Sequence, residues 1–119
     1  QLYAVPAVKA VAFGAGFGFA AMRGSQANDP FYMDGDTVRT RTNHTGGVNG
    51  GITNGMPVEF EVTIRPTPSI ARSQDTVDLS AGTDAKLEIT GRHDPCIVPR
   101  AVPVIESAAA LATCELLGI

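Results

Sequence analysis

Apolar and polar residues alternate most regularly between Met56 and Arg65. The apolar members of this run occupy every second position: Met56, Val58, Phe60, Val62 and Ile64. Successive side chains of a strand point to opposite faces of a sheet. The run therefore predicts a strand with one buried and one polar face.

Shorter apolar stretches bounded by turn residues predict further strands. Val5–Phe13 alternates small and branched apolar residues, and Asp34–Asp36 is a hairpin signal between two of the later stretches. The other predicted strands are Phe31–Met33, Thr37–Thr42, Gln74–Leu79 and Ala85–Thr90.

Two segments predict helices. Arg100–Leu117 has helical spacing of its apolar residues and small residues almost all round, so we expect it to be covered on most sides. Phe17–Arg23 predicts a short helix that ends at Gly24. Strands together with one long and one short helix indicate an α+β fold. We expect a single domain over residues 1–119, with an antiparallel sheet packed on the long C-terminal helix.

Composition excludes several classes of protein. The formal net charge of -3 argues against broad binding to nucleic acid, which requires a basic face. Neither Cys96 nor Cys114 has a second ligand at zinc-like spacing, which argues against a metal site. Residues 1–22 are apolar, but Pro6 and several glycines interrupt them, so we expect no secretory signal and no membrane span. Because the chain opens with Gln1 inside this apolar run, we expect a piece of a longer protein.

Two glycine-rich segments are candidate ligand loops. Gly14–Gly18 reads G-x-G-x-G and lacks the spacing of a dinucleotide-binding loop. Gly46–Gly55 contains five glycines, which allow backbone to approach a ligand closely. A flexible turn and a structured loop both fit the second segment, and the adjacent strand favours the structured loop.

Two charged segments could hold an anion. Arg65–Ile70 combines an arginine, two prolines and two hydroxyls, which suits either a phosphate contact or a rigid connector. Asp94 precedes Pro95 and is therefore expected in an extended conformation, on the same side of the chain as Arg92. The Arg92–Asp94 pair could clamp an anion and move a proton, or be a solvated ion pair.

These segments together resemble chorismate synthase, in its C-terminal part. The family's glycine-rich segment is similar to Thr42–Pro57, and its Lys-Pro-Thr-Pro-Ser stretch is similar to Arg65–Ser69. Its closing signature resembles Gly91–Glu106, a run that we know in no other family. Family members are much longer than this chain.

The resemblance implies a lyase of the shikimate pathway, which makes the precursor of the aromatic amino acids. The family converts 5-enolpyruvylshikimate 3-phosphate to chorismate by a 1,4-anti elimination of phosphate and needs reduced FMN. It also implies a cytoplasmic homotetramer with a β-α-β sandwich, with no nucleic-acid or membrane partner.

The family's site residues can be carried over by position. The flavin contacts fall on Pro6, Ala7, Gly50 and Arg92, and on the run Arg65, Pro66, Thr67, Pro68 and Ser69. Arg92 also matches a substrate-binding position. Asp94 matches the catalytic carboxylate that assists proton removal. No metal is implied.

Several positions depart from the family pattern. Arg65 stands where lysine is usual, and Pro6 stands where some members have asparagine. The family's two acidic histidines belong to the absent N-terminal part, and neither His44 nor His93 corresponds to them. We therefore expect these 119 residues alone to be inactive. The alternative is a non-catalytic folding or oligomerisation module of the same enzyme.

Overall fold

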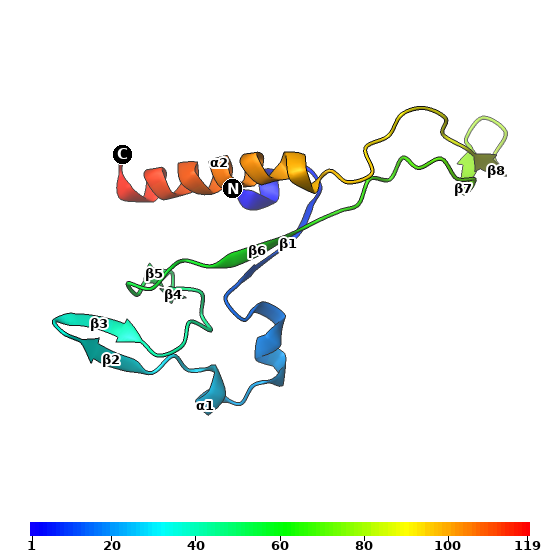
Figure 1. Cartoon of the computed structure of the whole chain (residues 1–119). Helices are drawn as coiled ribbons and strands as arrows, with labels where there is room; N and C mark the ends of the chain where they lie inside the picture. Colours follow the sequence, from blue (N-terminus) through cyan, green and yellow to red (C-terminus); the bar gives the residue numbers. More distant parts are fainter. The chain divides into compact units, whose positions relative to one another are not determined.

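Strands β1 (Val8–Phe13) and β6 (Phe60–Ile64) form an antiparallel pair in which Val11 faces Val62. The computed structural model describes all residues from Gln1 to Ile119. Its internal contacts divide the chain into two compact units, Gln1–Ile64 and Arg65–Ile119. Figure 1 shows β1 and β6 side by side in the first unit. The prediction of a single domain stays a prediction.

The alternation of apolar and polar residues predicted between Met56 and Arg65 is confirmed in β6. Its residues alternate between half-buried and exposed, beginning with half-buried Phe60, whose ring centroid lies 5.6 Å from that of Phe13. The strand is shorter than the predicted Met56–Arg65. Residues 56–59 do not join the strand ladder, because Pro57 has no N–H and the backbone of Glu59 bonds to the glycine-rich segment.

The first strand also begins later than predicted. A 3-10 helix, η1 (Leu2–Ala4), precedes it, and β1 begins at Val8 where Val5 was expected. Ala7 lies between them with a φ of 71°, the only positive φ outside glycine. A left-handed residue cannot continue a strand, which explains the later start.

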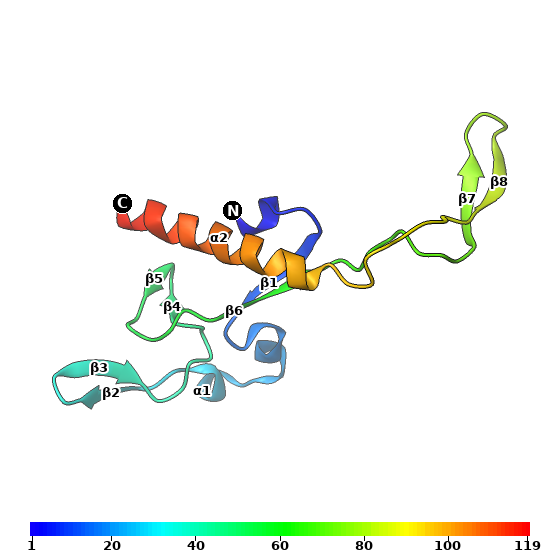
Figure 2. The same cartoon turned by 45° about the horizontal axis from the view of Figure 1, so that its top comes forward.

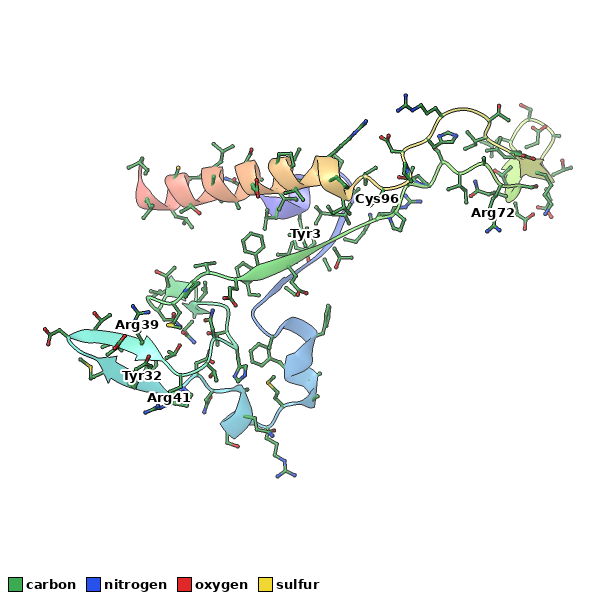
Figure 3. The ribbon with its side chains drawn as sticks, viewed as in Figure 1. Tyr3, Tyr32, Arg39, Arg41, Arg72 and Cys96 are labelled. Carbon is green, nitrogen blue, oxygen red and sulfur yellow. The ribbon has the colours of Figure 1, made fainter.

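A hairpin follows in the first unit, as predicted. β2 (Phe31–Asp34) pairs with β3 (Thr37–Thr40) around Gly35. One face of the hairpin carries an ion pair between Arg39 and Asp34 and places Arg41 over the ring of Tyr32; Figure 3 labels both arginines and the tyrosine. Its other face leaves Phe31, Met33 and Val38 exposed.

Short elements complete the first unit. The predicted helix over residues 17–23 is instead a 3-10 helix, η2 (Gly16–Ala21), followed by one α-helical turn, α1 (Gly24–Ala27). The glycine-rich segment is structured, as favoured, and forms a two-residue hairpin of β4 (Val48–Asn49) and β5 (Ile52–Thr53). Val8 is the only buried hydrophobic residue of the chain.

The second unit contains a hairpin and a helix. β7 (Gln74–Asp78) pairs with β8 (Thr83–Leu87), and α2 spans Val98–Leu117 (Figure 2). β8 begins earlier than the predicted Ala85 because Asp78 accepts hydrogen bonds from the N–H groups of Ser80 and Ala81, which tightens the turn.

Helix α2 confirms the predicted long C-terminal helix. It begins at Val98, two residues before the predicted start at Arg100. It contains Pro103 and ends at Gly118, which adopts the left-handed conformation common after helices. No residue of the second unit is buried. This unit therefore has no hydrophobic core of its own. The α+β class with small antiparallel sheets and a C-terminal helix is confirmed. None of the helices is long and apolar enough to span a membrane.

Candidate functional site

Asp29 holds the segment that leads into the glycine-rich hairpin. Its Oδ1 accepts hydrogen bonds from Thr42 Oγ1 at 2.7 Å and from the N–H of His44 at 2.8 Å. Its Oδ2 accepts from the N–H of Thr45 at 2.9 Å and from Thr45 Oγ1 at 2.8 Å. Four donors thus converge on one carboxylate that is 9% exposed.

These contacts decide the protonation of Asp29. Burial by itself raises the pKa of a carboxyl, because it disfavours the charged form. Here the hydrogen bonds from Thr42, Thr45 and His44 favour the anion more strongly and lower the pKa of Asp29 from 3.8 to about 2. Asp29 is therefore an ionised, buried anchor at neutral pH.

Beyond Asp29, the loop is held by backbone next to the ends of both strands, after β1 and before β6. The N–H of Ala15 donates to His44 O at 2.7 Å, and the N–H of Glu59 donates to Gly46 O at 3.1 Å. Gly14 and Gly46 pass so close that a Cβ on Gly46 would lie 2.5 Å from Gly14 N. Only glycine fits at this crossing, so the base of the hairpin is held rigidly.

The tip of the glycine-rich hairpin is open. Gly50 has a φ of 58°, and no atom lies within 4 Å of the position that a Cβ would take. The loop below it is held by the N–H of Asn54, which donates to Gly47 O, and by Asn54 Nδ2, which donates to Asn49 Oδ1. Gly50 thus presents bare backbone on a supported turn, an arrangement that lets a flat ligand approach closely.

Pro6 and Ala7 lie before β1, at the end of the ladder where β6 leaves it. The β1–β6 register shifts between Val8 and Ala10, which marks a bulge directly after the left-handed Ala7. Strained backbone and bulges are concentrated near functional sites in proteins. The geometry is compatible with the predicted role of this dipeptide.

In the second unit, the predicted contacts lie in two segments that run beside each other. Both views show the chain that leaves β6, with Arg65–Ser69, next to the chain that leads into α2, with Arg92–Asp94 (Figures 1 and 2). Arg65 and Arg92 are exposed and form no ion pair. The buried atoms Thr67 Oγ1 and His93 Nε2 have no hydrogen-bond partner.

This set of groups fits an anionic ligand. Two unpaired guanidinium groups can bind phosphate or carboxylate oxygens, and an unpartnered hydroxyl can donate to them. Buried polar atoms without partners are rare and costly in a native protein. The orphaned atoms of Thr67 and His93 therefore favour a ligand or a further segment of protein at this place.

Asp94 does not form the ion pair predicted for it with Arg92. Its Oδ2 lies 2.8 Å from an Nη atom of Arg100, in the first turn of α2. The prediction considered only neighbours along the local chain, whereas the cation that pairs with Asp94 comes from the first turn of the following helix. Arg92 is thereby left without an acidic partner.

The predicted site residues are divided between the two units. Arg65–Ser69 and Arg92–Asp94 belong to the second unit, and Pro6–Ala7 and Gly50 belong to the first. Sequence reasoning did not single out Asp29, because an aspartate before Pro30 reads as an ordinary turn residue. The one available signal was the Thr42–Thr45 segment, whose two hydroxyls supply donors.

Comparisons with known proteins agree with one another. The family model described as chorismate synthase matches residues 1–117. A chorismate synthase of Dehalococcoides mccartyi is 52% identical over 115 residues, which are 97% of this chain and 32% of that protein. One of Thermococcus gammatolerans is 54% identical over 109 residues, which are 92% of this chain and 31% of that protein.

A solved structure, a crystal structure of chorismate synthase, is similar with a TM-score of 0.53 and 38% identity. It covers 57% of this chain, which corresponds to 20% of that protein. The chain spans about a third of the length of the curated relatives it matches. With a family match along nearly its whole length, the chain belongs to the chorismate synthase family.

Proposed function

We propose that these residues form the C-terminal part of a chorismate synthase that eliminates phosphate from 5-enolpyruvylshikimate 3-phosphate with reduced FMN. Family membership supports the reaction class. The observation that carries the cofactor and substrate proposal is that the cations Arg65 and Arg92 are unpaired and that the buried polar atoms of Thr67 and His93 have no partner.

Each chain segment has a distinct proposed role. Arg65, Thr67 and Ser69 bind the phosphate of the cofactor, while Pro66 and Pro68 hold that segment extended. These residues lie in the short run Arg65–Ser69. A guanidinium in place of the usual lysine keeps the charge and adds a planar fork of donors.

The first unit and Arg92 complete the proposed contacts. Gly50, which has no side chain, and the segment of Pro6 and the left-handed Ala7 are proposed to contact the cofactor. Arg92 binds an anionic group of the substrate or the cofactor. When bound, reduced FMN supplies the electron density that expulsion of phosphate from the ring requires.

Asp94 assists removal of the substrate proton. Arg100 binds its Oδ2, which orients the carboxylate and leaves Oδ1 to hold a proton. The side chain of Asp94 is 38% exposed, so it is accessible to a bound ligand. This geometry supports a positioned carboxylate more than a free surface charge.

The remaining part of the enzyme is proposed to complete the site and cover the second unit. Arg65–Ile119 has no buried residue, and α2 exposes Val98, Val102, Val104 and Leu111. Such apolar surface normally contacts protein. We therefore expect the isolated chain to be inactive, and the assembled enzyme to be a cytoplasmic homotetramer.

The same exposed apolar surface favours the second candidate, a non-catalytic module for folding or oligomerisation. A chimeric enzyme distinguishes the catalytic function from this non-catalytic one. The N-terminal part of the Dehalococcoides mccartyi relative is joined to residues 1–119, in place of the matching 32% of that protein. If the proposed function is correct, the chimera produces chorismate with reduced FMN and the isolated chain does not.

Matched variants sharpen this experiment. Arg92→Gln in the chimera is expected to lose most of its activity and to weaken flavin binding. Arg72→Gln is the control, since Arg72 is an exposed arginine of the same unit outside the proposed site (Figure 3). A folded chimera without activity would support the non-catalytic module. Equal activity of both variants would contradict the role of Arg92.

A further inference from the structure

Asp29 holds residues 42–45, which lead into the glycine-rich hairpin with its turn at Gly50. It binds Thr42, His44 and Thr45, which are 13 to 16 positions away in the chain. These three residues directly precede the glycine-rich hairpin. The carboxylate itself is buried and has no exposed face for a ligand.

Separate backbone hydrogen bonds fix the short segment of chain between this anchor and the hairpin. His44 O accepts from Ala15 N, and Gly46 N donates to Asn43 O. Gly47, which follows, accepts from the N–H of Asn54 at 3.0 Å and so closes the base of β4–β5. The orientation of the turn at Gly50 is therefore set by where Asp29 places residues 42–45.

We propose that Asp29 is a positioning residue for the cofactor, acting through the backbone of residues 42–47 on the turn at Gly50. This inference rests on the proposed function, in which Gly50 contacts reduced FMN. Asp29 touches neither substrate nor cofactor. Its effect is to preorganise the loop, so that binding does not have to order it.

The carboxylate is specifically suited to this role. Four donors converge on two oxygens, and every one of them is an N–H or a hydroxyl. An asparagine would direct an NH2 group toward one pair of these donors and leave them unpaired, although its size is unchanged. The ionised state that these bonds favour also makes them charge-assisted.

The test uses the chimera with Asp29→Asn and, as a matched control, Asp34→Asn. Asp34 is an exposed carboxylate of the same unit, paired only with Arg39. For Asp29→Asn we expect the apparent KM for reduced FMN to rise roughly tenfold, as for loss of a charge-assisted contact, with kcat at saturating flavin nearly unchanged. Asp34→Asn leaves both constants unchanged.

Hydrogen exchange at the His44 and Thr45 amides supplies a readout independent of flavin, since each of the two amides donates to a different oxygen of Asp29. In Asp29→Asn, exchange is expected to speed up by about tenfold or more at whichever of the two amides faces the NH2 group, because that amide loses its acceptor. Thr45→Val, which removes only the hydroxyl donor, is a milder variant should Asp29→Asn fail to fold. It is expected to raise the KM for flavin about threefold, as for one weaker hydrogen bond.

The outcomes are distinguishable. Faster exchange at the His44 or Thr45 amide with an unchanged KM for flavin would overturn the positioning role while leaving the proposed function intact. Unchanged exchange at both amides would show that Asp29 does not hold the loop, and would also overturn it. A parent chimera without any flavin dependence would refute the proposed function first, and the inference with it.

Discussion

Replacing Gly46 by alanine tests whether the crossing of Gly14 and Gly46 holds the first unit together. Gly46 has a φ of 67°, and a Cβ there would lie 2.5 Å from both Glu59 O and Gly14 N. Both neighbours are backbone atoms, which cannot rotate away as a side chain would. The chain segments must therefore separate to admit the methyl group.

The magnitude follows from two contributions. A left-handed conformation costs an alanine about 1–2 kcal/mol. Separation also weakens the bonds from Glu59 N–H to Gly46 O and from Gly14 N–H to Glu59 O, each worth about 1 kcal/mol. The expected loss is therefore about 3–4 kcal/mol for Gly46→Ala.

Gly50→Ala is the matched control. Gly50 has a similar φ of 58°, but nothing lies near its Cβ position. Only the conformational cost of about 1–2 kcal/mol applies there. Urea denaturation of both chimeric variants measures the difference, and hydrogen exchange at the Gly14 and Glu59 amides locates it. The reasoning fails if Gly50→Ala is as destabilising as Gly46→Ala, or if those two amides exchange at the parent rate in Gly46→Ala.

Three further predictions follow from other contacts. The pKa of Asp29 is lower in the folded chain than its ordinary value, so its contribution to stability is complete above about pH 4 and is lost as pH falls toward 2. This contribution is about 2 kcal/mol. Urea denaturation from pH 6 to pH 2.5 should show it in the parent and not in Asp29→Asn; parallel curves would contradict the assignment. Arg100→Ala removes the partner of Asp94, and we expect chimera stability to change by less than about 1 kcal/mol while kcat falls several-fold. An unchanged kcat would show that Arg100 does not orient Asp94. In the isolated chain, iodoacetamide should label exposed Cys96 faster than the half-buried Cys114, as mass spectrometry of partly labelled protein can measure. The reverse order would contradict the exposure of Cys96.

Local pattern was sufficient for the regular elements. The alternation around Phe60–Ile64, the Asp34–Asp36 turn and the small-residue run of α2 each appear in the structure close to their predicted places. Element ends were less well predicted, because backbone groups near them bond to distant segments. Glu59 bonds to Gly46 in this way and does not extend β6.

Family membership was also evident from the sequence alone, since the Gly91–Glu106 run and the glycine-rich segment are specific in their order of residues. The roles carried over to Gly50, Arg65, Arg92 and Asp94 stay predictions. The structure supplied an independent reason to test them, because it leaves both arginines without acidic partners and the Gly50 turn open.

Only the tertiary structure decided which partner each polar group takes. Asp29 and the donors of residues 42–45 are separated in the sequence by the β2–β3 hairpin. Asp94 pairs with Arg100 and not with Arg92, which is nearer in the sequence. Periodicity is set by neighbours along the chain, so sequence alone determined the elements and the family. Hydrogen bonds between distant segments depend on how those elements pack together in three dimensions. A local sequence pattern does not specify which distant residues are brought into contact.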